Sequence, residues 1–354
     1  MRMNRTVRIG PKKIGDGAPC FIIAEAGSNH NGKLKQAFRL IDIAAEAGAD
    51  AVKFQTFRAQ TLYLKSAGRS DYLKIKKSIY DIIKEMEMPP AWIPKLAAHC
   101  KTKKILFLST PTDEICADLL APYVPAYKVA SYEMTAAPLV EYLAKKGKPM
   151  LVSTGAADLK EVRETVEVIK KTGNRNLILL QSTAAYPAPL GAVNAKSILT
   201  MKQEFGVPVG LSDHSREWDV APMAAVALGA NCIEKHFTIS NSLPGPDHQF
   251  ALEPGELKQM VTKVRQVEQA LGSGEKKVQQ VEQELRKFAR RSIFATHPIK
   301  KGEKFTRGNI ATLRCGTQKG LLHPREFSNL LDRIAVRDIP AEGAIQAGDY
   351  ARKS

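Results

Sequence analysis

Several features of other protein classes are absent from this sequence. No apolar run reaches the roughly 18 residues that a membrane-spanning helix needs, and the opening residues MRMNRTVRIGPKK include no apolar segment of the kind that directs secretion. We therefore expect a cytoplasmic protein without a membrane partner. The five cysteines are an odd number and form no close pairs along the chain, which is typical of a reducing compartment and argues against a disulfide framework.

Nucleotide chemistry and nucleic-acid binding also have little support. Neither a G-x-G-x-x-G segment nor a P-loop occurs. The formal net charge of +17 would suit a polyanion, but aromatic residues make up only 6% and glutamates interleave with the basic residues. We expect a solvated basic surface and no nucleic-acid partner, with a dedicated polyanion site as the alternative.

One pattern repeats along the chain: an apolar run ends in a charged or hydroxyl side chain, just before a turn or helix signal. The eight endings are Glu25, Lys53 with Gln55, Thr110, Lys128 with Ser131, Ser153 with Thr154, Ser182 with Thr183, His214 and His236. Helical periodicity fills most of the intervals, which predicts eight βα units and a parallel sheet closed into a barrel. Such barrels carry their chemistry at the carboxyl ends of the strands, so these endings form the candidate site.

Three parts are predicted along the chain. Residues 1–275 form the barrel, with a short β-type segment before it; residues 276–288 form a helical linker; residues 289–354 form a separate small domain with short β-like runs broken by Gly and Pro. The second βα unit carries a long excursion over residues 58–90, including a helical stretch with Ser70 as its predicted cap. Excursions at this face often line a site.

Two histidines suggest a metal site. His214 and His236 end the seventh and eighth strands, which are adjacent in such a barrel, so both imidazoles can reach one divalent ion. For either histidine taken alone, the alternative to a metal ligand is an ordinary surface or core residue. Since no cysteine-rich ligand set is present, manganese or magnesium (Mn2+ or Mg2+) is favoured over a structural zinc ion.

Cations and hydroxyl groups end the neighbouring strands. The group comprises Lys53, Thr110, Lys128, Ser131, Ser153 and Thr154. Such groups hold a phosphate or a carboxylate without a glycine-rich loop. For each lysine, the alternative to ligand binding is an ordinary solvated cation. A lysine inside the run AVKFQ incurs a desolvation cost without a structural reason, which favours a ligand.

Carboxylates and loop residues complete the candidates. Glu25 and Glu234 suit general acid or base work, or they orient a lysine or histidine. Period-two alternation places Glu234 with His236, Lys53 with Gln55, and Ser212 with His214 on shared strand faces. The turn GSNHNG either presents Asn29, His30 and Asn31 to a sugar-like ligand or is only a tight turn. The loop at residues 245–254 places Asp247 and His248 after the eighth strand.

These residues resemble the sialic acid synthases. The segments FIIAEAGSNHNG, AVKFQTF, FLSTP, YKVAS, STG, GLSDHS, IEKHFT and GPDH with ALEP occur in the family's order, followed by ARRS…G…F…LR, so the likeness spans nearly the whole chain. It implies a (β/α)8 TIM barrel followed by a small antifreeze-like (SAF) β-clip domain, in a domain-swapped homodimer. It also implies that phosphoenolpyruvate is joined to an N-acetylated hexosamine of the mannosamine type, giving a nine-carbon 2-keto acid and phosphate.

The resemblance assigns roles to single positions. His214 and His236 match the family's metal ligands, and Glu25 matches the carboxylate proposed to move protons. Phosphoenolpyruvate contacts are implied for Lys53, Thr110, Lys128, Ser131, Ser153 and Ser212, with Gln55 and Tyr186 nearby. Sugar contacts are implied for Glu133, Asp247 and Arg314, and Arg314 would reach the partner's barrel from the small domain.

The sequence departs from the family pattern in two places. Gln181 to Ala184 stand where many members read His-Cys-Thr followed by Asn or Ser, and Cys315 replaces a common proline. Both changes resemble a branch associated with spore coat polysaccharide synthesis in bacilli. We therefore predict a metal-dependent synthase of a sialic-acid-like sugar for a surface or spore coat polysaccharide, with an acceptor that need not be N-acetylmannosamine. The alternative is a non-catalytic relative that binds a glycan or scaffolds coat assembly.

Overall fold

A computed structural model describes residues 2–69 and 77–351. The chain folds into two compact units, Met1–Gly272 and Ser273–Ser354. Among the described residues, no helix combines the length and the apolar character needed to cross a membrane. All five cysteines are buried and unpaired, as the sequence predicts.

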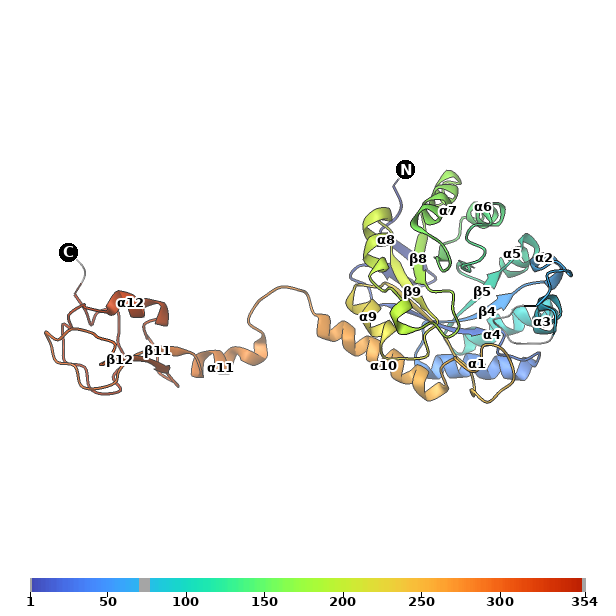
Figure 1. The fold of residues 1–354 in the computed structure, drawn as a ribbon. Coiled ribbons are helices and arrows are strands. Elements are labelled where there is room, and N and C mark those ends of the chain that lie inside the picture. Colours follow the sequence, from blue (N-terminus) through green and yellow to red (C-terminus); the bar gives the residue numbers. More distant parts are fainter. Residues whose placement is uncertain (1, 70–76, 352–354) are drawn as a thin grey trace. The chain divides into compact units, whose positions relative to one another are not determined.

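The first unit is a barrel of eight parallel strands surrounded by helices (Figure 1). Neighbouring strands follow the order β5-β4-β3-β10-β9-β8-β7-β6, and the two end strands β5 and β6 lie against each other. The strands are β3 (Phe21–Gly27), β4 (Ala51–Thr56), β5 (Leu106–Pro111), β6 (Tyr127–Val129), β7 (Met150–Ser153), β8 (Leu177–Ser182), β9 (Val209–Asp213) and β10 (Cys232–His236). The predicted (β/α)8 TIM barrel is therefore confirmed.

A helix follows each strand of the barrel and covers its outer face. These helices are α1 (Leu34–Ala47), α4 (Ile93–Thr102), α5 (Glu114–Leu120), α6 (Ala137–Lys145), α7 (Leu159–Lys171), α8 (Ser197–Phe205), α9 (Ala221–Ala227) and α10 (Pro254–Leu271). Local sequence sets their ends: Asp158 and Glu161 form a reciprocal capping box at the start of α7, and Gly48 ends α1 with a left-handed backbone.

The excursion between β4 and α4 contains two short helices and a 3-10 turn. These are α2 (Ala59–Leu62), α3 (Ile79–Met86) and η1 (Pro90–Trp92). The side chain of Ser78 caps α3 by accepting a hydrogen bond from the backbone N–H of Asp81 at 3.2 Å. Ser70, the predicted cap, lies outside the described residues.

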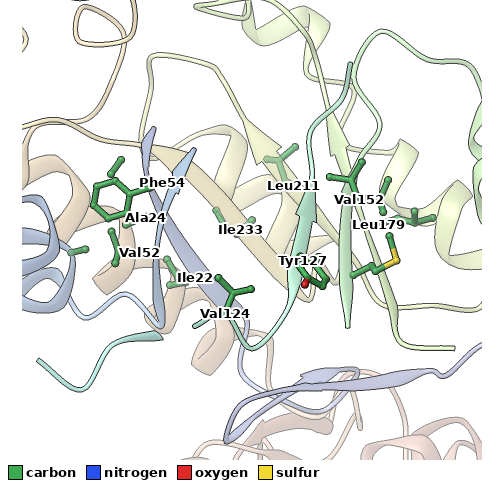
Figure 2. Packing of buried hydrophobic residues seen from close by; sticks show 14 of the residues in the cluster. Ile22, Ala24, Val52, Phe54, Val124, Tyr127, Val152, Leu179, Leu211 and Ile233 are labelled. Carbon is green, nitrogen blue, oxygen red and sulfur yellow. The ribbon is translucent and has the colours of Figure 1, made fainter. Parts of the chain in front are cut away.

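Two apolar clusters divide the barrel into an outer layer and an inner plug. In the outer layer, alternate strand residues pack against the helices; Figure 2 shows Ile22, Val52 and Leu179 among them. The inner cluster joins the inward-facing residues of the first half of the strands to an N-terminal hairpin of β1 (Thr6–Ile9) and β2 (Lys12–Gly15). Because the strands are buried on both faces in this half, polar inward-facing residues are confined to their carboxyl ends.

The second unit has a small core of its own. After η3 (Gln280–Glu282) and α11 (Gln283–Phe288), strand β11 (Arg291–Ala295) pairs antiparallel with β12 (Ile310–Arg314), and η4 (Pro324–Glu326) leads into α12 (Phe327–Leu330). Ile293, Phe305, Ile310 and Ile345 are among its buried residues. The Cys315 thiol donates a hydrogen bond to the carbonyl of Arg290. The SAF identity of this unit stays a prediction.

Candidate active site

Eight of the predicted site residues form one continuous network at the carboxyl ends of the strands. Lys53 Nζ lies 2.7 Å from Glu25 and 3.7 Å from Glu234, and it donates to Thr110 at 3.0 Å. Lys128 Nζ lies 3.7 Å from the same Glu234 oxygen and donates to Ser153 at 2.7 Å. The network is completed by bonds from Gln55 to Glu25 and from Ser212 to Glu234.

Strand alternation explains why these groups meet. On β3, Phe21 and Ile23 belong to the inner plug, and Glu25 is the next residue on that face. On β4, Ala51 is followed in the same way by Lys53 and Gln55. Each strand thus changes from apolar to polar on one face within two residues, which places the polar groups directly above the plug.

Burial and neighbouring charges set the pKa values of the two carboxyl groups in this network. The Lys53 and Glu25 side chains are 3% and 1% exposed. Burial raises the pKa of the Glu25 carboxyl to about 7, although Lys53 opposes this. Burial would also raise the pKa of Glu234, but Lys128 and Lys53 together outweigh it and hold that pKa below its usual value. Glu234 therefore acts as the shared counter-ion of both lysines, while Glu25 can hold a proton near neutral pH.

A second group lies around two histidine rings. The His214 and His236 rings are 5.4 Å apart between centroids, and the Tyr186 ring lies 4.2 Å from His214. His236 Nδ1 has no hydrogen-bond partner and lies 3.6 Å from the Asp247 carboxylate. Burial lowers the pKa of both histidines, so both rings are neutral.

Gly27 keeps the space between the two groups open. Its backbone has a φ of 51°, and strand pairing is irregular between Glu25 and Gly27. A side-chain carbon added at Gly27 would lie 3.3 Å from Asp247 and 3.5 Å from Glu25. Both the left-handed backbone and this close approach require glycine here.

A cavity of about 530 Å³ lies beside these residues. This cavity opens beside His236 and the end of β4. Its polar side is formed by Gln55, Tyr186, His236 and Asp247. Its other side is formed largely by the excursion between β4 and α4, including α3. The predicted role of this excursion as a wall of the site therefore agrees with its position.

The loops after β3 and β10 brace each other. Asn29 donates to the carbonyl of Phe237 at 2.9 Å, and Asn31 donates to the carbonyl of Pro244 at 3.0 Å. His248 bonds Asn31 and Thr238, while His30 is fully buried. The GSNHNG segment is thus a tight turn bonded to the loop after β10, which favours the simpler of its two interpretations.

The unusual segment after β8 acts on a predicted metal ligand through its backbone. The carbonyl of Thr183 accepts a hydrogen bond from His214 Nδ1 at 2.8 Å. The side chains of Gln181 and Thr183 donate to the carbonyls of Val193 and Ala192 in the following loop. Because Nδ1 of His214 carries the proton in this bond, its Nε2 is left with a lone pair.

Four further residues from the sequence analysis lie outside the network. Ser131 accepts a hydrogen bond from the N–H of Gly155, and burial raises the pKa of the partly buried Glu133. Thr154 bonds the carbonyl of Leu180 on the outer face of its strand, unlike Ser153, so its predicted place among the anion-binding hydroxyls is wrong. Arg314 ends β12 in the second unit, and its role stays a prediction.

Sequence reasoning missed one buried ion pair. Lys235 Nζ lies 2.5 Å from Asp213 Oδ2, and both side chains are buried behind β9 and β10. Lys235 also donates to the carbonyls of Ser215 and Glu217, just after His214. The signal was present: alternation places Lys235 and Asp213 on the helix-covered faces of their strands, where a charge needs a partner.

Comparison with known proteins identifies the family. A family model described as the NeuB family matches residues 40–276. The chain belongs to the NeuB family. Its resemblance to the sialic acid synthases is thereby confirmed.

Relatives of this NeuB-family chain match along nearly its whole length. The spore coat polysaccharide biosynthesis protein SpsE of Bacillus subtilis is 47% identical over 98% of this chain and 97% of its own length. The N,N'-diacetyllegionaminic acid synthase of Campylobacter jejuni is 40% identical over 92% of this chain and 98% of its own. The crystal structure of a sialic acid synthetase from Leptospira borgpetersenii, in complex with citrate, has a TM-score of 0.73 at 34% identity, covering 80% of this chain and 96% of that one.

These relatives establish the general activity. Members of the family that match this chain are named synthases of sugar acids. The NeuB-family chain is therefore an enzyme of the transferase type and a sugar-acid synthase. The non-catalytic alternative is not favoured.

Proposed function

We propose that this enzyme joins phosphoenolpyruvate to an N-acetylated mannosamine-type sugar and releases phosphate, in a reaction that depends on a divalent metal ion. The product is a nine-carbon, sialic-acid-like 2-keto acid for a surface or spore coat polysaccharide. The observation that carries the proposal is the meeting of two buried lysines with two buried histidines at one end of the barrel.

The lysines suit the anionic donor. Phosphoenolpyruvate carries a phosphate and a carboxylate, and Lys53 and Lys128 lie on either side of Glu234. Hydroxyl groups of Thr110 and Ser153 already bond these lysines and are near enough to share in anion binding. When Glu25 takes a proton, the two lysines keep a net positive charge for the donor.

The histidines fit a metal ion by their chemistry. His214 presents Nε2 because Nδ1 is bonded to Thr183, and His236 has a buried ring nitrogen without a partner. Within residues 2–69 and 77–351, no group of three or more His, Cys, Asp or Glu side chains is arranged to hold a metal. The remaining ligands in this proposal are oxygens of substrate and water, which is typical of catalytic sites.

Each side chain has a separate role in the proposed reaction. A metal ion bound by His214 and His236 would supply a Lewis acid for the sugar carbonyl. Lys53 and Lys128 bind the donor and stabilise charge on the departing phosphate. Glu25 holds or moves a proton at its carboxyl group, and Glu234 keeps both lysines in place.

Phosphate release tests the proposal. The enzyme is incubated with phosphoenolpyruvate, manganese and a panel of N-acetylated hexosamines, and the product from labelled phosphoenolpyruvate is identified by mass. We expect phosphate release that depends on both the sugar and the metal. No turnover with any sugar, in a folded and metal-loaded sample, would count against the proposal.

The metal component is tested by His236→Ala. We expect loss of calorimetric manganese binding and of activity, with an unchanged circular dichroism spectrum. His99→Ala is the control, because His99 pairs with Asp42 on the outside of the barrel at 2.8 Å. Manganese binding that persists in His236→Ala would contradict the assigned ligand.

A further inference from the structure

A second cavity lies on the helix-covered side of the barrel, between the beginnings of α7 and α8. We call it the outer cavity, and its lining residues fall within residues 154–162, 181–184 and 194–201. Its volume is about 540 Å³, close to that of the cavity beside His236. An ion pair between Arg163 and Glu204, at 2.6 Å, joins the two helices.

The segment that departs from the family pattern forms one wall of the outer cavity. All four residues from Gln181 to Ala184 line it, whereas Ala184 alone of them lines the cavity beside His236. Gln181 continues the series of Leu177 and Leu179, which pack against the helices, so its side chain faces away from the barrel interior. The change in sequence is therefore concentrated at the outer cavity.

The opposite wall offers hydrogen-bonding groups that the protein itself does not use. Asn194, Ser197 and Thr200 line the cavity from α8 and the loop before it. Within the described part of the chain, none of these three side chains forms a hydrogen bond. Serine and threonine in a helix can bond a carbonyl of the preceding turn, but Ser197 and Thr200 do not, so their hydroxyl groups are available to a ligand.

The rest of the lining selects against an anion. Asp158 is the only charged side chain among the described residues that line the cavity, and its carboxylate accepts a hydrogen bond from the N–H of Glu161 at 2.9 Å. An anionic ligand would lose its hydration without meeting a cation. Leu159, Val162 and Met201 add apolar surface. A sugar ring suits such a lining, because it has hydroxyl groups for the polar wall and C–H groups for the apolar one.

We propose that the outer cavity is a second binding site, for an uncharged, hydroxyl-rich molecule of the sugar class. This inference goes beyond the proposed function and does not depend on it. It gives the segment from Gln181 to Ala184 a role outside the cavity beside His236. Because the carbonyl of Thr183 accepts a hydrogen bond from His214 Nδ1, the ligand contacts the segment that orients His214.

Sugar binding measured by calorimetry, without phosphoenolpyruvate or metal, tests the inference. The probes are glucose, N-acetylglucosamine and the 6-phosphate of each. We expect at least one of the two uncharged sugars to bind with a dissociation constant of about 1 mM or tighter. Absence of binding by both uncharged sugars in this range would overturn the inference.

A variant that fills the outer cavity shows where the sugar binds. In Thr200→Phe we expect the affinity for the uncharged sugar to fall at least about tenfold, because the phenyl ring occupies its space. Thr200 is exposed, so the larger side chain does not enter the core. Leu199→Phe is the control, because Leu199 lies on the same helix, is 46% exposed and does not line the cavity. An unchanged affinity in Thr200→Phe would overturn the inference.

The polar wall is tested by removing two hydroxyl groups while keeping the shape of the side chains. In Ser197→Ala with Thr200→Val, we expect the affinity for the uncharged sugar to fall about tenfold, since two hydrogen bonds are lost. An unchanged affinity would contradict the role of these hydroxyl groups.

The same variants test the charge of the ligand. Any binding of the two 6-phosphates should be equal in wild type and Thr200→Phe, because phosphorylated sugars do not enter the outer cavity. A 6-phosphate that loses its affinity in Thr200→Phe would overturn the uncharged class. Absence of turnover in the phosphate-release assay contradicts only the proposed function, whereas absence of Thr200-dependent sugar binding contradicts only the present inference.

Discussion

Glu25 and Glu234 are the same kind of side chain, buried in the same network, yet their pKa values move in opposite directions. Burial dominates at Glu25 and raises its pKa to about 7. At Glu234, Lys128 and Lys53 act together and outweigh burial, so its pKa is lowered. The number of lysines near each carboxyl group thus separates a carboxyl that can hold a proton near neutral pH from one that stays charged as a counter-ion.

Lys128→Met should weaken phosphoenolpyruvate binding at least about tenfold, because it removes one of the two cations that the proposed function assigns to the donor. Calorimetry measures the dissociation constant. Lys12→Met is the control: Lys12 pairs with Asp50 at 2.7 Å on the N-terminal hairpin and is 50% exposed. Equal affinities of wild type and Lys128→Met would remove Lys128 from the donor site.

His30 should make stability depend on pH. Burial lowers its pKa from 6.5 to about 4, and its Nδ1 accepts a hydrogen bond from the N–H of Gly32. The unfolded chain therefore binds the proton more readily, so this stabilisation is complete above pH 6.5 and is lost as the pH falls toward 4.

The contribution of His30 is isolated with His30→Gln, because other buried groups also titrate in this range. Between pH 6.5 and 4, the free energy of unfolding of the wild type should fall by about 3 kcal/mol more than that of the variant. Urea unfolding at several pH values measures the two slopes. Parallel slopes would contradict a neutral buried His30.

At the scale of elements, the ends of β9 and β10 are joined by a buried ion pair. Lys235 on β10 reaches Asp213 on β9, and Asp213 also accepts hydrogen bonds from the N–H and hydroxyl of Ser215. The two strands that carry His214 and His236 are therefore connected on their outer faces. This connection fixes the spacing of the histidines on the inner side.

Lys235→Met should lower the free energy of unfolding by about 3–5 kcal/mol, because Asp213 is left as an unpaired buried charge. Denaturant unfolding measures the loss. In Lys235→Met with Asp213→Asn, most of the loss should be recovered, since the charge is gone and an acceptor for Ser215 is kept. Lys202→Met is the control, because its partner Asp16 is 85% exposed; its change should stay within about 1 kcal/mol.

At the scale of the molecule, the second unit is predicted to complete the site of a partner chain. The resemblance to the family implies a domain-swapped homodimer in which Arg314 reaches the partner's barrel. We therefore expect a solution mass of twice 38.9 kDa by sedimentation. A mass equal to one chain would contradict the dimer.

Mixing two inactive variants distinguishes a swapped dimer from an unswapped one. Under this prediction, Arg314→Ala and His236→Ala each lack one part of the site. In a swapped heterodimer, the intact barrel of one chain meets the intact second unit of the other, so subunit exchange should restore about a quarter of the activity. In an unswapped dimer no site is intact, and no activity should return.

Strand patterns predicted much of the site because alternation fixes which side chains share a face. The carboxyl-end residues Glu25, Lys53, Lys128 and Glu234 were all found in this way. Thr154 was misjudged because it directly follows Ser153 and points to the other face of the strand. Lys235 was missed because it faces the helices, between the inward-facing residues Glu234 and His236.

The amino-acid sequence by itself determined the barrel, the polar strand endings and the family, since all three depend on order and spacing along one chain. Only the tertiary structure decided which groups meet: that Glu234 lies between two lysines, that Thr183 orients His214, and that α3 lines the cavity beside His236. These arrangements depend on distances between segments far apart in the sequence. Such distances exist only once the barrel has closed.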